Sequence, residues 1–160
     1  MSMMVYIRLA PFLLTLAVCC WAGTGEPPTL HLIGDSTMAP KASDKRPETG
    51  WGEGLGDLFV DGVTLNNAAV NGRSSKSFID EGRWQKVLDA LEPEDYVFIQ
   101  FGHNDQKYKS PDRFAYPTTT YRQNLVRYIE ETRARQAHPI LLTSIAVSYT
   151  HLTLPTTLNS

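Results

Sequence analysis

Three short polar segments could together carry out acyl transfer: Gly34-Asp35-Ser36, Asn71-Gly72-Arg73 and Gly102-His103-Asn104-Asp105. Acyl transfer needs a nucleophile and hydrogen-bond donors that face the developing oxyanion. Ser36 could supply a hydroxyl and its own N–H, Gly72 an N–H that no side chain shields, and Asn104 a side-chain NH₂ group. Each signal alone is weak, because a serine at a strand end is often a helix cap and Asn-Gly is usually a turn. Their combination predicts a serine hydrolase site, provided that the fold brings the three segments together.

Each polar segment follows an expected strand. Apolar and β-forming runs predict strands at four places, Thr29–Ile33, Val63–Val70, Tyr96–Phe101 and Ile140–Ile145. Helical spacing of apolar residues predicts helices at three places, Trp51–Phe59, Trp84–Leu91 and the stretch after Thr118–Thr120, which is expected to be capped by these threonines. Polar residues 41–49 are expected to form a surface loop. The alternation predicts a parallel sheet with helices on both faces, in which the carboxyl ends of the strands border one crevice.

The composition excludes several classes of protein. The chain has 160 residues, a formal net charge of −2 and 42% hydrophobic residues, which fits one ordinary globular domain. It has no basic field that would bind a nucleic-acid backbone, and no polybasic patch that would hold an anionic membrane. We therefore expect neither a nucleic-acid partner nor a membrane-surface partner.

The first 23 residues have the pattern of a secretory signal peptide. Arg8 is their only charge, Leu9–Trp21 is nearly all apolar, and small residues follow at Ala22-Gly23. A retained anchor and a lipid on one of the two leader cysteines, Cys19 or Cys20, are the alternatives. We expect a secreted or periplasmic protein that has no integral membrane association and no disulfide after cleavage.

The polar segments also resemble a known family, the SGNH or GDSL-type serine hydrolases. "GDST" at 34–37, Gly72 in "NGRSS" and Asn104 in "GHND" match its first three blocks in order. Longer stretches such as "TGWGEGLGDLF", "NNAAVNGRSSKSFIDEGRW" and "FIQFGHNDQKY" are similar to the rhamnogalacturonan acetylesterases, and this similarity extends from about Thr29 to Ile145.

The resemblance implies a flavodoxin-like three-layer α/β/α sandwich with no cofactor and no metal. It implies that Ser36 is the nucleophile, that the N–H groups of Ser36 and Gly72 and the Asn104 side chain hold the oxyanion, and that Asp35 orders the serine turn. The implied substrate is an acetylated plant polysaccharide or oligosaccharide, namely pectin.

The base that a catalytic serine needs is missing from its usual place. The family supplies it from a late Asp-x-x-His block, and no such block occurs in these 160 residues. None of the four histidines is a good substitute. His31 is expected inside a strand, and His103 is next to the motif asparagine. His138 is expected at the opposite edge of the sheet, and His151 lies in a Ser-x-x-His sequence, "SYTH", in place of Asp-x-x-His. We expect little or no esterase activity from this chain itself.

The end of the sequence departs from the rest in composition. No Asp, Glu, Lys or Arg occurs from Gln136 to Ser160. We therefore interpret residues 24–146 as the N-terminal part of an SGNH hydrolase domain that lacks its last strand and helix, and residues 147–160 as a non-native tail.

Other functions stay open from the sequence. An acetylxylan esterase or a lipase-like enzyme would share the same three blocks. A non-catalytic carbohydrate-binding protein could stack sugar rings on Trp51, Tyr108 and Tyr116, although packing in the core or in loops would also explain these aromatics. A phosphate or nucleotide site lacks the glycine-rich loop that it needs, and His103 with Asp105 is too small a set for a metal.

Overall fold

A parallel four-stranded sheet organises the computed structural model, which describes residues 27–59 and 63–145. The strand order is β2-β1-β3-β4, with β1 (Thr29–Gly34), β2 (Thr64–Asn67), β3 (Tyr96–Gln100) and β4 (His138–Leu141). The helices are α1 (Trp51–Gly54), α2 (Ser75–Asp80), α3 (Arg83–Ala90) and α4 (Arg122–Ala134). The predicted α/β architecture with a parallel sheet is confirmed.

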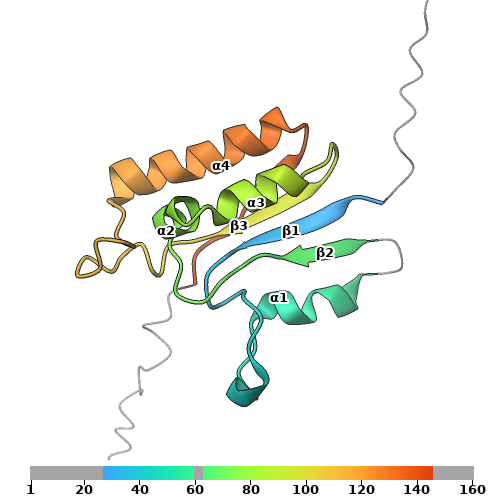
Figure 1. Ribbon diagram of the computed structural model, residues 1–160, viewed down its shortest axis with the longest axis horizontal. Coiled ribbons are helices and arrows are strands. Elements are labelled where there is room, and N and C mark those ends of the chain that lie inside the picture. Colours follow the sequence, from blue (N-terminus) through green and yellow to red (C-terminus); the bar gives the residue numbers. More distant parts are fainter. Residues whose placement is uncertain (1–26, 60–62, 146–160) are drawn as a thin grey trace, which may run out of the picture.

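Helices cover both faces of the sheet. Figure 1 shows α2, α3 and α4 on one face and α1 on the other. Successive side chains of a strand point to opposite faces, so β1 supplies both layers of the core. Leu32 packs with Met38 on the α1 side, whereas Ile33 packs with Trp84 and Tyr128 under α3 and α4. The core therefore has two apolar layers, one on each face of the sheet.

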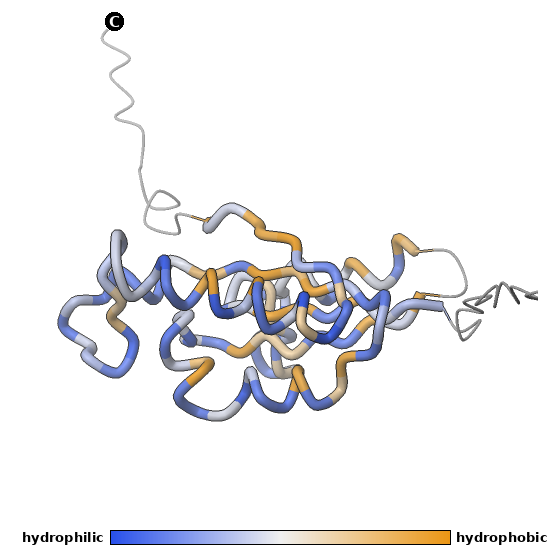
Figure 2. Tube along the Cα trace, turned by 90° about the horizontal axis from the view of Figure 1, so that it is seen from above, coloured by the Kyte–Doolittle hydropathy of each residue, from blue (hydrophilic) through white to orange (hydrophobic). Residues whose placement is uncertain are grey.

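Strand β4 lies at an edge of the described sheet. Figure 2 shows a hydrophobic stretch along this edge, near the C-terminal end of the described chain. The strand begins at His138, includes Pro139 and ends at Leu141, whereas the predicted strand covered Ile140–Ile145. Pro139 has no N–H to give to a ladder, which an edge strand tolerates. Of the described helices, none is long and apolar enough to cross a membrane.

Local structure differs from the prediction in three helical segments. The expected helix over Trp51–Phe59 is one turn of α1 followed by a 3-10 turn, which leaves Leu58 78% exposed; the four glycines of residues 50–56 weaken a longer helix. The polar turn after Asn71 continues into α2, a helix that the sequence reading missed, capped by the Ser74 side chain. Residues Pro117–Tyr121 form a π-helical turn before α4, so Thr118–Thr120 lie inside this turn and do not cap the helix as predicted.

The second strand is also shorter than the predicted Val63–Val70. It ends at Asn67, but Ala68 and Val70 still donate their N–H groups to the carbonyls of Leu32 and Gly34, at 2.9 and 3.1 Å. The backbone therefore follows β1 to its end although the ladder has stopped. The expected signal peptide, residues 1–23, lies outside the described residues, as does the expected tail, residues 147–160.

Candidate active site

The candidate site lies where the winding of the sheet changes direction. Strand β1 is flanked by β2 and β3, so the connections that leave β1 and β3 diverge at their carboxyl ends. Ligands of such sheets bind in the crevice at this point. Gly34 pairs with Gln100 in register, so the turn that carries Ser36 and the turn that carries Asn104 begin side by side.

Asp35 holds the turn that carries Ser36. Its carboxylate is buried, and Oδ1 accepts hydrogen bonds from the backbone N–H and the hydroxyl of Thr37, both at 2.9 Å. Its carbonyl accepts from the N–H groups of Met38 and Ala39. The expectation that Asp35 orders this turn is confirmed, and Ser36 is left half-buried at the turn.

Asn104 connects the third segment to the other two. Its side chain is only 1% exposed, and Nδ2 donates to the carbonyl of Arg73 at 3.0 Å. Nδ2 also lies 3.5 Å from Oδ2 of Asp35, at the limit of a hydrogen bond. Oδ1 accepts from Nζ of Lys107 at 2.7 Å. The carboxamide therefore has one firmly bound N–H and a second N–H that is only weakly held beside the serine turn.

Gly72 lies in a turn that needs its conformational freedom. Its φ is +78°, a value that L side chains rarely adopt. The N–H of Arg73 closes the turn on the carbonyl of Val70 at 3.3 Å. This turn is fixed to the serine turn through Val70 and Gly34 and to the asparagine turn through Arg73. The structure thus brings together the three segments that contain Ser36, Gly72 and Asn104.

Lys41 is a positioning residue that the sequence reading missed. The polar loop 41–49 was expected on the surface, but the Lys41 side chain is only 2% exposed. Its ammonium donates to the carbonyl of Ser36 and, at 2.9 Å, to Oδ1 of Asn71. Glu48 lies 3.4 Å from it. Nothing in the sequence around Lys41 distinguishes it from the exposed Lys45 of the same loop.

Gln100, like Lys41, joins several segments by hydrogen bonds, and it lies below the crevice. Oε1 accepts from the indole N–H of Trp51 at 2.8 Å and from the hydroxyl of Thr37 at 3.2 Å. Nε2 donates to the carbonyl of Thr143 at 3.0 Å. One buried amide thus joins β3, α1, the serine turn and the segment after β4. A glutamine inside an apolar strand was the available signal, because a buried polar side chain needs partners.

Asp105 fixes the start of α2 beside the Gly72 turn. Its carboxylate accepts from the N–H and the hydroxyl of Ser75, at 3.0 and 2.6 Å, and Asn124 donates to that hydroxyl. Burial raises the pKa of the Asp105 carboxyl, and the bonds from Ser75 partly oppose this. These contacts make Asp105 a structural residue of the fold that also sets the second segment in place.

The described histidines lie as the sequence suggested. His31 is buried and hydrogen-bonded to Asp95 (3.2 Å) and Asn66 (3.0 Å). His138 lies at the opposite sheet edge and contacts Glu94. His103 is half-buried in the third segment, and His151 lies outside the described residues.

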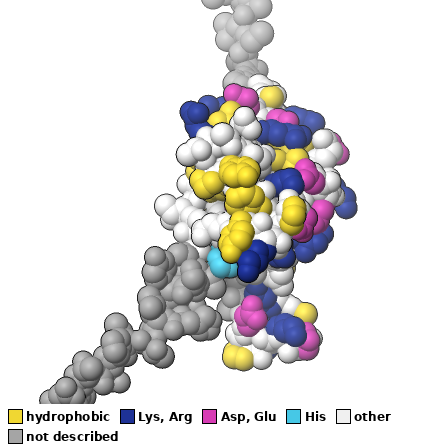
Figure 3. Space-filling view, turned by 90° about the vertical axis from the view of Figure 1, so that its left-hand side faces the viewer, with side chains coloured by type: hydrophobic (Ala, Val, Ile, Leu, Met, Phe, Trp, Pro, Cys, Tyr) yellow, Lys and Arg dark blue, Asp and Glu magenta, His cyan; other side chains and the backbone are white. Residues whose placement is uncertain are grey.

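The three aromatic residues considered for sugar stacking separate into two groups. Trp51 is half-buried in the core and bound to Gln100, so it is a packing residue. Tyr108 and Tyr116 are 70% and 64% exposed, on the segment that follows Asn104. Figure 3 shows the face at the carboxyl ends of the strands, where hydrophobic side chains gather beside Lys and Arg side chains.

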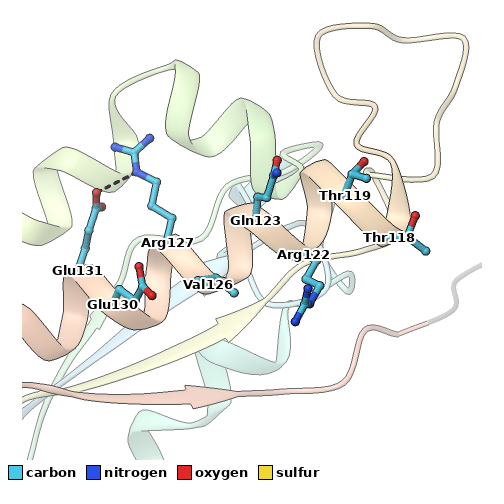
Figure 4. A pocket seen from close by; sticks show the side chains of 8 residues that line it. All are labelled: Thr118, Thr119, Arg122, Gln123, Val126, Arg127, Glu130 and Glu131. Carbon is cyan, nitrogen blue, oxygen red and sulfur yellow. Dashed lines mark hydrogen bonds and ion pairs between the residues drawn. The ribbon is translucent and has the colours of Figure 1, made fainter.

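Two surface hollows of the described chain border the π-helical turn and α4. One follows the outer side of α4 and is bordered by the ion pair of Arg127 and Glu131 (Figure 4). Another lies between β3, β4 and α4 and is lined by Tyr121 and Leu125 among others. Within the described residues, no group of three or more His, Cys, Asp or Glu side chains could hold a metal ion.

Comparison with characterised proteins gives a consistent picture. The chain is 44% identical over 117 residues to the probable rhamnogalacturonan acetylesterase YesY of Bacillus subtilis, covering 73% of this chain and 54% of that protein. It is 39% identical to the rhamnogalacturonan acetylesterase RhgT of the same organism, covering 75% and 50%. The chain thus spans about half the length of these curated relatives.

Solved structures agree on the fold. YxiM of Bacillus subtilis superposes with a TM-score of 0.64 at 25% identity, over 73% of this chain and 32% of that one. The psychrotrophic esterase EstA from a Pseudoalteromonas species superposes with a TM-score of 0.56 at 25% identity, over 75% and 62%. The model of the GDSL-like lipase/acylhydrolase family matches residues 32–159. With the sheet order, the converging turns and this match in agreement, the chain belongs to the GDSL-like lipase/acylhydrolase family.

Proposed function

We propose that this chain carries the nucleophile and the oxyanion donors of a serine esterase that removes acetyl groups from pectin. The observation that carries the proposal is the hydrogen-bonded junction of the three turns through Asp35, Lys41 and Asn104. Such donors act best when they are held before the reaction begins. The identity to rhamnogalacturonan acetylesterases supports the acetyl ester and the pectin substrate.

In the proposed reaction, the Ser36 hydroxyl attacks the carbonyl carbon of the acetyl ester. The carbonyl oxygen becomes an oxyanion that accepts hydrogen bonds from the N–H groups of Ser36 and Gly72 and from the weakly held N–H of Asn104. The sugar oxygen takes up the proton that the Ser36 hydroxyl has lost and leaves as a hydroxyl when the carbonyl forms again, which gives an acetyl-serine. Water then attacks this ester and releases acetate.

In this scheme, Asn104 donates to the oxyanion with the N–H that lies near Asp35. The 3.5 Å separation from Oδ2 of Asp35 leaves this N–H weakly held and available to the oxyanion, whereas the 3.0 Å bond of the other N–H to Arg73 keeps the carboxamide in place. Donors of this kind contribute about 10²- to 10³-fold in rate each.

The proton of the serine hydroxyl needs a base, and the 160 residues contain no Asp-x-x-His block. We therefore propose that the 160-residue chain is acetylated slowly and turns over little. Loss of a triad member leaves a residual acceleration of about 10³- to 10⁴-fold over water, which the oxyanion donors and substrate binding supply.

Stopped assays with p-nitrophenyl acetate test both parts of the proposal. We expect one slow release of p-nitrophenol of at most one equivalent, with no release above background in Ser36→Ala. Release that is unchanged in Ser36→Ala would contradict the role of Ser36. Sustained turnover that disappears in His151→Ala would contradict the expected inactivity.

The substrate is tested by the rate at which different acetyl donors acetylate Ser36. We expect acetylated rhamnogalacturonan oligosaccharides to react faster than acetylated xylan oligosaccharides or a short lipid ester. A faster reaction with xylan would favour an acetylxylan esterase, and tight sugar binding without any acetylation would favour a carbohydrate-binding protein. We also propose export through the leader at residues 1–23, since the polysaccharide lies outside the cytoplasm; retention of the expressed chain in the cytoplasm would contradict it.

A further inference from the structure

We propose that Arg113 is a specificity-determining residue, which binds the carboxylate of an acidic sugar next to the ester that Ser36 attacks. The inference rests on the proposed function. It starts from one contact: a Cβ built on Gly72 would lie 3.8 Å from Nη1 of Arg113. The guanidinium therefore lies directly beside the turn whose N–H is proposed to hold the oxyanion.

The guanidinium has donors that the described protein does not use. A guanidinium carries five N–H donors. Among the described residues, the guanidinium makes one hydrogen bond, from Nη2 to the hydroxyl of Ser110 at 3.2 Å. Nε is buried without a hydrogen-bond partner there, and its 3.7 Å ion pair reaches Asp112, whose side chain is 73% exposed. An exposed pair of this length contributes little.

The segment that carries Arg113 is held in place before any ligand binds. The N–H of Arg113 donates to the carbonyl of Ser110 at 2.9 Å, and Nζ of Lys76 donates to the carbonyl of Pro111 at 2.6 Å. The N–H of Ala115 donates to the carbonyl of Asp105 at 3.1 Å. A cation on a backbone fixed in this way loses less freedom when it binds an anion than one on an unanchored loop.

An acidic sugar fits the chemistry around Arg113. Guanidinium and carboxylate groups match as two parallel hydrogen bonds, which a neutral ester cannot form. Lys107 and Lys109 add positive charge on the same segment, where Asp112 is the exposed acid. The exposed ring of Tyr116, packed edge-on against Phe114, offers an apolar surface on which a sugar ring can stack. An ester substrate that carries a carboxylate one sugar away is therefore favoured over a neutral one.

The test compares two ligands whose carboxyl groups are either free and charged or methyl-esterified and neutral. Partly acetylated tetragalacturonate and its fully methyl-esterified form are titrated into the 160-residue chain by calorimetry, in the Ser36→Ala background so that no ester is cleaved. We expect the acid to bind about tenfold more tightly, as one charged hydrogen-bonded pair supplies. Arg113→Gln should remove this preference. Arg133→Gln, the same change at the far end of α4, should keep it.

If Arg113 had a purely structural role, Arg113→Gln would weaken the binding of both ligands equally. The loss of the preference for the acid is therefore the deciding result. Preference that survives in Arg113→Gln, or a parent chain that binds both ligands equally, would overturn the proposal. If Arg113→Gln does not unfold cooperatively, the Nε–H resonance of Arg113 in the parent decides: it should move with the acid and not with the methyl ester. Acetylation of Ser36 is measured separately, so the proposed esterase function and the proposed role of Arg113 can each fail without the other.

Discussion

The side chain of Asn104 donates a hydrogen bond to the backbone carbonyl of Arg73, with Nδ2 and O 3.0 Å apart. This bond joins the turn after β3 to the turn that contains Gly72, across a separation of 31 residues in sequence. The carboxamide is thus a structural link as well as a proposed oxyanion donor, and the two roles use different N–H bonds.

Removing this link should destabilise the fold. In Asn104→Ala, the Arg73 carbonyl and the Lys107 ammonium lose their partner, and a side chain that is 1% exposed leaves a cavity. We expect a loss of about 1–3 kcal/mol in the free energy of unfolding, measured with urea. Gln123→Ala, on the exposed side of α4, should change it by less than about 0.5 kcal/mol. Equal stabilities of the two variants would contradict the role of the Asn104 link.

Lys41 should matter more than its loop position suggests. Lys41→Met removes the ammonium that joins the Ser36 carbonyl to Asn71, and it leaves both acceptors without their partner. We expect a loss of about 1–3 kcal/mol in stability and slower acetylation of Ser36. Lys45→Met is the matched control in the same loop, because that side chain is 62% exposed. If both substitutions had the same small effect, Lys41 would not be a positioning residue.

Alanine should have opposite effects at two glycines. Gly72→Ala places a Cβ at φ +78°, which costs about 1–2 kcal/mol, although the nearest atom, Nη1 of Arg113, would be at an ordinary 3.8 Å. Gly54→Ala, at the end of α1, meets nothing within 4 Å and should raise stability by about 0.5–1 kcal/mol. Urea unfolding of the two variants measures both effects. A stabilised Gly72→Ala would show that the turn does not need glycine.

Glu53 should give the protein part of its acid sensitivity. The N–H of Gly50, the hydroxyl of Thr49, the guanidinium of Arg46 and the N–H of Lys41 all donate to its carboxylate, and they lower its pKa from 4.5 to about 2. Because the folded pKa lies below the unfolded one, the charged carboxylate stabilises the fold above about pH 4.5, and this stabilisation is lost as the pH falls towards about 2.

The free energy of unfolding at pH 5.5 and at pH 3 measures this effect. It should fall less between these pH values in Glu53→Gln than in the parent chain, because the amide does not titrate. Glu130→Gln, on the exposed side of α4, should keep the parent's pH dependence. An unchanged pH dependence in Glu53→Gln would refute the assignment.

The centre of the sheet could be predicted from sequence because β1 and β3 are mostly apolar runs that both layers of the core bury. Val97 and Ile99 are almost fully buried, and such a run leaves few alternatives to a central strand. The three turns were also predictable, since each combines a strand end with a glycine and a polar side chain. Helix α2 was not, because the start "SSKSF" is typical of a turn until Asp105 and the Ser74 cap bind its first N–H groups.

The network behind the turns could not be predicted for a similar reason. The partners of Lys41 and Gln100 lie on other elements, up to 63 residues away along the chain, and only the folded sheet brings them together. Local periodicity carries no information about such pairs. The exposure of Leu58 was not predicted, because the spacing of apolar residues does not show where glycines end a helix. The predicted helix Trp51–Phe59 ends at Gly54, so Leu58 lies outside it.

The central claim is that these turns activate Ser36 towards acyl transfer, and peptide mapping by mass spectrometry after brief exposure to p-nitrophenyl acetate tests it most directly. Ser43, in the exposed 3-10 turn of the same chain, is the internal control. We predict that the acetyl group accumulates on Ser36 at least tenfold faster than on Ser43, and that Asn104→Ala removes most of this difference. Equal acetylation of both serines, or an unchanged excess at Ser36 in folded Asn104→Ala, would contradict the account.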